Sequence, residues 1–245
     1  MIQTSSESKV IAVADGTEML VYVARPVPGT VRTVSGGRLP AVMVFQEAFG
    51  VNGHIRHIAD RLAAEGYVTV APELFHRTAP RKFEGNYADF DSVMPHLSAL
   101  TVEGMASDIR ASYALLKTDA QVDEARIGCL GFCMGGRASF IANATVPLQA
   151  AIAYYGARIA PDLLDRAKDQ AGPIAFFWGG LDKHIGPEQR RAVADAMTAA
   201  GKDFVEVCFA KADHAFSCDE RPAYEPKAAA QAWAMSLQFL QDSMP

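Results

Sequence analysis

Residues 126–137 read RIGCLGFCMGGR, and this stretch has the most specific pattern in the chain. Its apolar first part, 127–130, predicts a strand, and the residues after the turn predict a helix. Between strand and helix lies Gly131-Phe-Cys133-Met-Gly135, a glycine-flanked turn with a cysteine at its centre. Glycines are expected on either side because larger side chains there would collide with neighbouring backbone in so sharp a turn.

The cysteine in this turn is placed for nucleophilic chemistry. A strand–turn–helix geometry exposes the sulfur of Cys133 at a helix N-terminus, where backbone amides favour the thiolate over the thiol. The alternative is a buried structural cysteine that happens to lie beside a glycine turn. The strand before the turn and the helix after it favour the nucleophile.

The remaining apolar runs predict an α/β fold with a mostly parallel central sheet of about eight strands and helices on both faces. The expected strands are Val10–Val13, Met19–Ala24, Ala41–Phe45, Val68–Ala71, Ile127–Leu130, Ala150–Tyr154, Ile174–Trp178 and Phe204–Phe209. From Ala41 onward they are short, continuously apolar and separated by helix-length segments. The first two precede any helix and are expected to form an antiparallel edge.

Apolar stripes at helical spacing predict the helices between these strands. The stripes are Ile55, Ile58, Ala59, Leu62 and Ala63; then Met105, Ile109, Tyr113 and Leu116; then Val193, Ala196 and Met197; and last Ala230, Trp233, Leu237 and Leu240. No repeat or linker interrupts the pattern, so residues 1–245 are expected to form a single domain. The irregular segment 76–100 follows a strand and is expected to shape a substrate site.

Composition excludes several classes of protein. Half of the 245 residues are hydrophobic, 21% are charged and the net charge is −5. A chain with this charge has no excess of positive side chains with which to bind nucleic acid or an anionic membrane. The longest uncharged stretch, Ala138–Ala157, holds too many polar residues for a membrane span. The polar start of the chain does not resemble a secretory signal, so a cytoplasmic protein is expected.

The cysteines and histidines predict neither a disulfide framework nor a metal site. The four cysteines form no CxxC pair, and Cys129 and Cys208, which fall in strands, are expected to be small core residues. His54 and His57 lie three residues apart at a helix start, but no third ligand has a suitable spacing. No metal and no cofactor are therefore expected.

A cysteine nucleophile needs a base, and the base needs a residue that orients it. After a turn of this kind the expected chain order is nucleophile, acid, histidine. Asp182 follows the predicted strand from Ile174, and His214 follows the one that ends at Phe209. His214 is therefore the predicted base, and Asp182 is predicted to hold its imidazole in the useful tautomer.

Three other residues are weaker candidates for these roles. Asp213 is adjacent to the histidine and is expected to point away from its ring. Asp219 comes after the histidine, against the expected order, and His184 follows Asp182 too closely to be its partner.

Two backbone N–H groups are expected to bind an oxyanion. Met134, directly after the nucleophile, supplies the first. The second is expected from the loop after strand Ala41–Phe45, where Ala48 is the predicted donor and Phe49 the runner-up.

Glu47 is unusual beside an oxyanion hole, because its carboxylate would oppose the developing negative charge. It could form a structural ion pair with Arg81 or Arg137. It could instead bind the thiol of Cys133 and keep it neutral at rest.

Four separated motifs resemble the dienelactone hydrolases (carboxymethylenebutenolidases) of the α/β-hydrolase superfamily. They are Gln46-Glu-Ala-Phe-Gly50, Gly131-Phe-Cys-Met-Gly-Gly136, Gly179-Gly-Leu-Asp182 and Asp213-His-Ala-Phe216, and the resemblance runs from about Met19 to the last helix. It implies the α/β-hydrolase fold and a triad of Cys133, His214 and Asp182. It also implies that Glu47 contacts the resting thiol until substrate displaces it.

The chemistry of cysteine narrows the substrate class. When a thiolate attacks an ordinary alkyl ester, the tetrahedral intermediate prefers to expel the thiolate again, because an alkoxide is the worse leaving group. Enol lactones such as dienelactone, aryl esters and thioesters have stabilised leaving groups and suit a cysteine nucleophile.

One position departs from the family pattern. Members that act on dienelactone place an arginine four residues after the histidine to hold the substrate carboxylate, whereas this chain has Cys218 there and Arg221 three residues further on. The family pattern also has a second arginine and a tyrosine, expected in the irregular segment, and Arg81 and Tyr87 are their loose counterparts here. Arg81 could equally be a solvated surface charge. Cys218 could alternatively be a redox-sensitive thiol. The predicted substrate-binding residues are Phe49, Arg81 and Arg221.

The leading hypothesis is a hydrolase that opens an enol lactone or other activated ester through a thioester acyl-enzyme. One alternative is a broad carboxylesterase or thioesterase of the same fold. Another is a non-catalytic thiol redox or binding protein. A small-molecule lactone or ester is the expected partner, in a monomer or homodimer, with no nucleic-acid or membrane partner.

Overall fold

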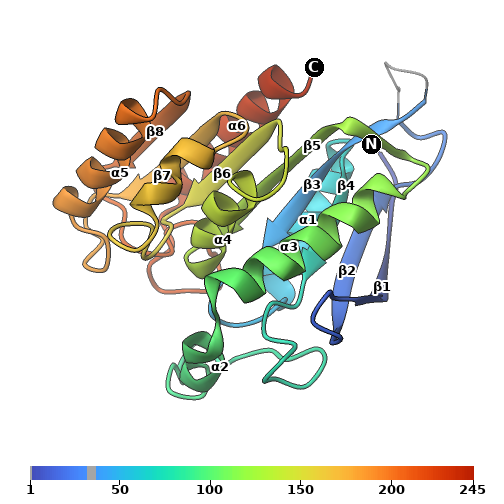
Figure 1. Cartoon of the computed structure of the whole chain (residues 1–245), viewed down its shortest axis with the longest axis horizontal. Helices are drawn as coiled ribbons and strands as arrows, with labels where there is room; N and C mark the ends of the chain where they lie inside the picture. The colour runs from blue at the N-terminus through green and yellow to red at the C-terminus, as the bar shows by residue number, and fades with distance from the viewer. Residues whose placement is uncertain (1, 32–36) are drawn as a thin grey trace. The chain divides into compact units, whose positions relative to one another are not determined.

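A computed structural model describes residues 2–31 and 37–245 of the chain, which form two compact units, Met1–Gly128 and Cys129–Pro245. The described residues are arranged as alternating strands and helices (Figure 1). This is the predicted α/β class. The expectation that the whole chain is a single domain stays a prediction.

Four strands of the first unit pair in the order β1-β2-β4-β3. They are β1 (Thr4–Ala12), β2 (Glu18–Pro26), β3 (Leu39–Phe45) and β4 (Val68–Pro72). β2 is antiparallel to both β1 and β4, whereas β3 runs parallel to β4. The predicted antiparallel edge of the first two strands is confirmed.

The described residues of the first unit form three helices: α1 (Gly53–Ala64), α2 (Met94–Ala99) and α3 (Val102–Lys117). The side chain of Asn52 caps α1 by accepting the backbone N–H of Ile55, and Thr101 caps α3 by accepting that of Gly104. All five apolar positions predicted for the first helix are buried, as an amphipathic helix against a sheet requires.

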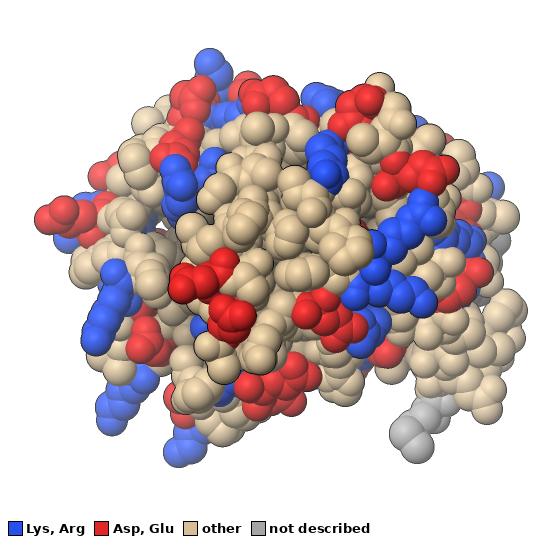
Figure 2. Space-filling view, turned by 90° about the horizontal axis from the view of Figure 1, so that it is seen from below, with Lys and Arg blue, Asp and Glu red and all other residues tan. Residues whose placement is uncertain are grey.

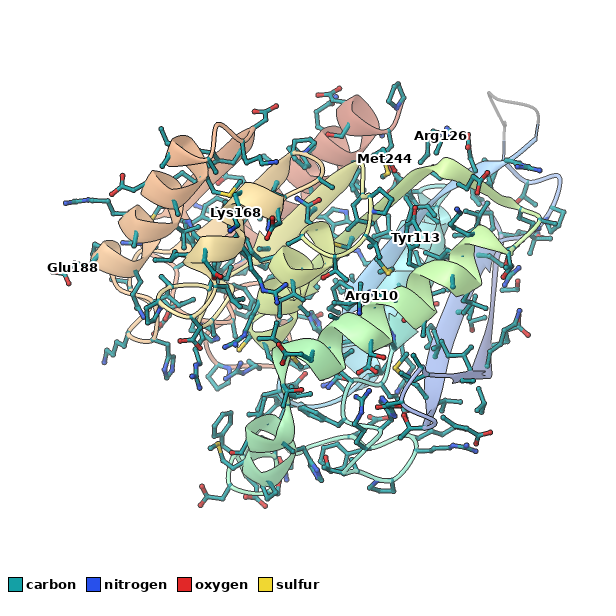
Figure 3. The ribbon with its side chains drawn as sticks, viewed as in Figure 1. Arg110, Tyr113, Arg126, Lys168, Glu188 and Met244 are labelled. Carbon is teal, nitrogen blue, oxygen red and sulfur yellow. The ribbon has the colours of Figure 1, made fainter. Side chains whose placement is uncertain are left out.

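Strand β5 (Val122–Phe132) begins in the first unit and ends in the second. The sequence analysis placed the start of β5 too late, because the apolar run begins only at Ile127. The earlier strand residues Asp123, Glu124 and Ala125 are partly or fully exposed and so show no apolar pattern. Arg126, labelled in Figure 3, donates hydrogen bonds to the Asp123 carboxylate and to the carbonyl of Arg38. The strand then continues buried to Phe132.

The second unit holds three parallel strands in the order β6-β7-β8, with four helical segments. They are α4 (Met134–Asn143), β6 (Ala150–Tyr154), the 3₁₀ helix η1 (Leu164–Asp169), β7 (Ile174–Gly179), α5 (Pro187–Ala199), β8 (Phe204–Phe209) and α6 (Pro226–Ser243). α4 and α6 pack against β6, and every residue of β6 and β7 is buried. Glu188 in the first turn of α5 is exposed (Figure 3).

Two sequence interpretations are wrong for a common physical reason. β1 extends back to Thr4, well before the predicted start at Val10, because the exposed polar residues before Val10 pair with β2 without showing an apolar pattern. Cys208 is exposed rather than in the core, since β8 is the last strand in the order and is only partly covered. Cys129, by contrast, is buried as expected.

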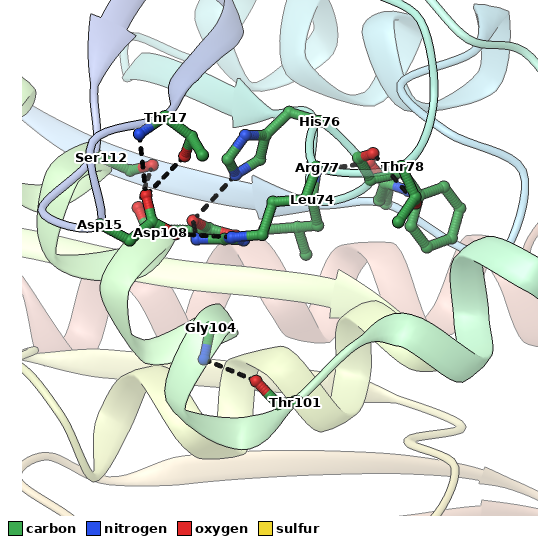
Figure 4. Close-up of polar contacts among 12 residues, drawn as sticks. Asp15, Thr17, Leu74, His76, Arg77, Thr78, Thr101, Gly104, Asp108 and Ser112 are labelled. Carbon is green, nitrogen blue, oxygen red and sulfur yellow. Dashed lines mark hydrogen bonds and ion pairs between the residues drawn. The ribbon is translucent and has the colours of Figure 1, made fainter.

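A buried ionic cluster holds the segment after β4 to α3 (Figure 4). The fully buried Asp108 carboxylate accepts two hydrogen bonds from the guanidinium of Arg77, at 2.9 and 2.7 Å, and contacts Nε2 of His76 at 3.1 Å. Arg77 also donates to Asp15 in the β1–β2 turn. Through Arg77, the cluster therefore connects α3, the segment after β4 and the β1–β2 turn.

Removing this carboxylate is expected to destabilise the protein strongly. Asp108→Ala leaves Arg77 and His76 without their shared acceptor, and we expect a loss of about 3 kcal/mol in the free energy of unfolding. The matched control is Glu124→Ala, which breaks an exposed ion pair with Lys117 and is expected to cost less than about 1 kcal/mol. Urea denaturation measures both, and equal losses would contradict this account.

Candidate active site

Cys133 lies in the tight turn between β5 and α4 with a strained backbone. Its φ of 54° is in the left-handed region, which residues other than glycine seldom adopt. Backbone hydrogen bonds hold this conformation: the N–H of Cys133 donates to the carbonyl of Tyr154 at 3.0 Å, and its carbonyl accepts from Arg137 and Ala157. The side chain is half-buried at the start of α4, the position that the sequence predicts.

A close approach of two glycines lets the turn pack against the end of β6. A Cβ atom on Gly136 would lie 2.7 Å from both the Cα of Gly156 and the carbonyl oxygen of Tyr154. Real Cβ atoms do not come so close to backbone, so glycine is required here. The second glycine after the cysteine in GFCMGG therefore has a packing role that the motif alone does not explain.

Asp182 is fixed in the loop after β7. Its Oδ1 atom accepts the backbone N–H groups of His184 and Ile185, at 2.8 and 3.1 Å. Its Oδ2 atom accepts a hydrogen bond from Nδ1 of His214 at 2.7 Å. Burial raises the pKa of the Asp182 carboxyl, but the hydrogen bond and charge of His214 and the two backbone donors outweigh it and lower the pKa overall.

Two glycines bring the loops of Asp182 and His214 together. A Cβ on Gly179 would lie 2.7 Å from the carbonyl oxygen of Ala212, and a Cβ on Gly180 would lie 2.6 Å from the Cα of Ala210. The backbone N–H of Leu181 also donates to Ala212 at 2.9 Å. The loops after β7 and β8 are therefore in direct backbone contact.

His214 is hydrogen-bonded to both Asp182 and Cys133. Since Nδ1 is bonded to Asp182, the bond to the cysteine uses Nε2. Burial alone lowers the pKa of His214, but its electrostatic and hydrogen-bond interactions with Cys133 and Asp182 outweigh the effect of burial and raise the pKa to about 10. The structure thus brings together the three residues that the sequence predicted as nucleophile, base and orienting acid.

Two of the three weaker candidates, Asp213 and His184, lie beside His214. Asp213 accepts the backbone N–H of His214 at 2.7 Å. The ring of the exposed His184 lies 5.1 Å from the ring of His214. The backbone N–H of His184 donates a hydrogen bond to the Asp182 carboxylate.

Tyr155 is a neighbour of the histidine that sequence reasoning missed. Its buried ring lies 5.1 Å from the ring of His214, and its φ of 36° is another left-handed conformation. Its position directly after β6, at the carboxyl end of a parallel strand, is the signal that could have identified it.

The loop Gln46–Gly50 is buried in the first unit beneath part of segment 76–100. Oε1 of Gln46 accepts the backbone N–H of Leu74, and the carbonyl of Phe49 accepts that of Gly85. The Phe49 ring lies 4.6 Å from the ring of Tyr87, in an edge-on contact. Segment 76–100 is thus irregular except for α2, and it packs against the loop Gln46–Gly50.

Glu47 and Ala48 are both buried in that loop, and their roles beside Cys133 stay predictions. The two arginines considered as partners of Glu47 form ion pairs elsewhere: Arg81 with Glu18, and Arg137 with Asp162.

The predicted substrate-binding arginines differ in their surroundings. Arg81 is more than half exposed and is paired with Glu18, which favours the interpretation of Arg81 as a surface charge. Arg221 is half-buried in the second unit, and Cys218 is completely buried. Substrate binding by Phe49, Arg81 and Arg221 stays a prediction.

Within residues 2–31 and 37–245, no three His, Cys, Asp or Glu side chains are grouped so that they could hold a metal ion. No helix in the same residues is long and apolar enough to cross a membrane. Acidic and basic side chains are intermixed on the face shown in Figure 2.

Comparisons with known proteins agree with the motifs. Residues 27–244 match the model of the dienelactone hydrolase family. A Salmonella typhimurium protein named "Putative carboxymethylenebutenolidase" is 35% identical over 237 residues, which cover 92% of this chain and 83% of that protein. A Synechocystis protein of the same name is 32% identical and covers 91% of each chain.

A crystal structure named "Putative Dienelactone Hydrolase", from Klebsiella pneumoniae, superimposes with a TM-score of 0.85 at 29% identity, over 98% of this chain and 99% of that one. The α/β architecture and these similarities define an α/β-hydrolase that acts on ester or lactone bonds. The chain belongs to the dienelactone hydrolase family. The predicted fold class is confirmed.

The raised pKa of His214 can be tested by following its ring protons by NMR. Because its pKa in the folded state, about 10, lies above the ordinary value of 6.5, the stabilisation from this proton is fully present below about pH 6.5 and is lost as the pH rises through about 10. We expect Cys133→Ala and Asp182→Asn each to lower the His214 pKa, since each removes a group that raises it.

Asp213→Asn is the matched control, because Asp213 bonds to the backbone of His214. A His214 pKa that does not change in Cys133→Ala would contradict the arrangement described here.

Proposed function

We propose that this protein hydrolyses enol lactones or other activated esters with Cys133 as nucleophile, His214 as base and Asp182 as the residue that orients the base. The observation that carries the proposal is the histidine bonded on one side to the carboxylate and on the other to the cysteine. This is the arrangement that nucleophilic acyl transfer requires.

The reaction proceeds in two halves. The Cys133 sulfur attacks the carbonyl carbon, its proton having passed to Nε2 of His214, and the resulting tetrahedral oxyanion collapses with cleavage of the carbon–oxygen bond. The protonated histidine donates to the leaving enolate or phenolate, and a thioester remains on Cys133. Water then attacks the thioester, His214 accepts a proton from that water, and the carbon–sulfur bond breaks to release the acid and regenerate the cysteine.

The pKa of His214 fits this sequence of steps. With its pKa raised to about 10, the imidazole of His214 holds its proton at neutral pH. The proton needed by the leaving group is therefore already in place when the attack begins. Asp182 bonds to Nδ1 and keeps Nε2 directed to the reacting atoms.

The backbone N–H of Met134 and that of Ala48 are the proposed oxyanion hole. Met134 is the first residue of α4, where unpaired N–H groups and the helix dipole favour negative charge. Ala48 lies in the buried loop after β3, the second source of such donors in this fold. Glu47 in the same loop is proposed to contact the resting thiol until a substrate displaces it, in keeping with the family resemblance.

The substrate class follows from the nucleophile. A thiolate is a better leaving group than an alkoxide, so only esters with a stabilised leaving group pass efficiently to the acyl-enzyme. Phe49 is proposed to contact the substrate, with Arg221 the better candidate for a carboxylate contact because Arg81 is paired with Glu18. A small-molecule lactone or ester is thus the proposed partner.

The test is steady-state hydrolysis of cis- and trans-dienelactone and of p-nitrophenyl acetate. We expect Cys133→Ala to lower kcat/KM at least about 10³-fold on every substrate that the wild type accepts, because the nucleophile is lost. Cys208→Ala, which alters an exposed cysteine in the same unit, is the matched control and should retain activity.

Comparing dienelactones with the aryl ester distinguishes a lactone hydrolase from a broad esterase. Dienelactone turnover that depends on Cys133 supports the lactone assignment, whereas aryl-ester turnover alone supports a broad esterase with the same nucleophile. Activity that survives in a folded Cys133→Ala protein would contradict the mechanism.

A further inference from the structure

The imidazole of His214 has two ring neighbours, one buried and one exposed. The ring of Tyr155 lies 5.1 Å from the imidazole, with an angle of 59° between the ring planes. The ring of His184 also lies 5.1 Å away, at an angle of 74°. Tyr155 is completely buried, whereas His184 is exposed. Tyr155 is therefore the ring that packs against the imidazole from the interior of the second unit.

Tyr155 also packs against residues beside the proposed nucleophile and the proposed base. Its ring lies 6.2 Å from the ring of Phe132, which directly precedes Cys133 in the chain. It lies 5.3 Å from the ring of Phe216, two residues after His214, in an edge-on contact. Aromatic pairs of this kind prefer particular orientations, so these contacts fix the plane of the Tyr155 ring.

The peptide group before Tyr155 connects strand β7 to the turn that holds the nucleophile. The N–H of Tyr155 donates to the carbonyl of Phe177 in β7 at 2.7 Å. The carbonyl of Tyr154, in the same peptide group, accepts the N–H of Cys133 at 3.0 Å. The backbone of Tyr155 is thus held directly against that of Cys133.

Left-handed backbone is concentrated at this site. Among the described residues, five that are not glycine have a positive φ, and three of these five are Cys133, Tyr155 and Ala215, the residue after His214. Their φ values are 54°, 36° and 65°. Such strain persists only where the surrounding structure holds it, and it clusters at active sites. The strain at Tyr155 therefore favours a role in the site beyond filling the core.

We propose that Tyr155 is a positioning residue, a role that rests on the proposed function. Its ring restricts rotation of the His214 imidazole, so that the bonds to Asp182 and Cys133 exist at the same time. Nδ1 meets the carboxylate and Nε2 meets the sulfur in only one orientation of the imidazole. A wall of fixed orientation against the imidazole keeps it there, and small displacements of a catalytic group are costly to the reaction.

The titratable groups around His214 have a different part. Cys133 and Asp182 bond to the imidazole, and His184 packs against it from the exposed side. Asp213 accepts the backbone N–H of His214. These groups act on the charge of the imidazole, whereas the ring of Tyr155 acts on its orientation.

The first test is the pKa of His214, followed by NMR of its ring protons. Tyr155→Leu fills part of the space without a flat ring, so the imidazole turns more freely and its bonds to Asp182 and Cys133 weaken. Because both interactions raise the pKa of His214, we expect the pKa to fall by about one pH unit or more. Tyr155→Phe keeps the ring and should retain the wild-type pKa.

Steady-state kinetics give a second readout. Tyr155→Leu should lower kcat about 10²-fold on an ester that the wild type hydrolyses, with little change in KM, because a misplaced base affects the reacting atoms and not substrate binding. Phe176→Leu is the matched control, since it replaces another buried ring of the second unit, one that packs against Phe140 and Trp178. It should change neither the His214 pKa nor kcat.

Urea denaturation establishes that each variant is folded. If Tyr155→Leu does not fold, Tyr155→Met gives the same comparison, because methionine also lacks a ring and adapts to irregular space. A folded variant without the ring that keeps the wild-type His214 pKa and kcat would overturn the proposal. So would a Tyr155→Phe protein as impaired as Tyr155→Leu, because the hydroxyl and not the ring would then be responsible.

The NMR measurement does not depend on turnover. A wild type that hydrolyses no ester would count against the proposed function alone. The difference in His214 pKa between Tyr155→Phe and Tyr155→Leu would still decide whether the ring of Tyr155 positions the imidazole.

Discussion

The hydrogen bond from Nδ1 of His214 to Asp182 is the interaction on which the rest of the site depends. It fixes the tautomer and the orientation of the imidazole, and so determines which ring nitrogen meets Cys133. The bond is possible because Gly179 and Gly180 let two loops touch through their backbones. A side chain at either glycine would separate the acid from the histidine, although neither glycine has a chemical role.

Strain and packing support the proposed nucleophile, Cys133, in a similar way. Cys133 has a left-handed backbone because its N–H donates to the carbonyl of Tyr154, the last residue of β6, and its carbonyl accepts the N–H of Ala157 in the segment that follows. Gly136 and Gly156 allow that segment to approach α4 closely. Both halves of the site therefore rest on glycine contacts between the carboxyl ends of parallel strands, the usual location of active sites in such sheets.

The positions of the three proposed triad residues could be predicted from the sequence, because their order along the chain is constrained. Cys133, Asp182 and His214 each follow a strongly apolar strand, and parallel strands bring such positions to one edge. Contacts between loops could not be predicted in the same way. Tyr155 and the packing glycines have no periodic signal, and the exposed Cys208 was mistaken for a core residue because an edge strand has the same composition as a central one.

The central claim is a thioester intermediate on Cys133, and the most direct measurement is intact-protein mass spectrometry of the enzyme quenched with acid during turnover of p-nitrophenyl acetate. The account predicts a fraction of the protein heavier by one acetyl group, with peptide mapping locating that group on Cys133, and no such species in Cys133→Ala. An acetyl group on a different residue, or rapid turnover of a protein in which Cys133 has been replaced, would contradict it.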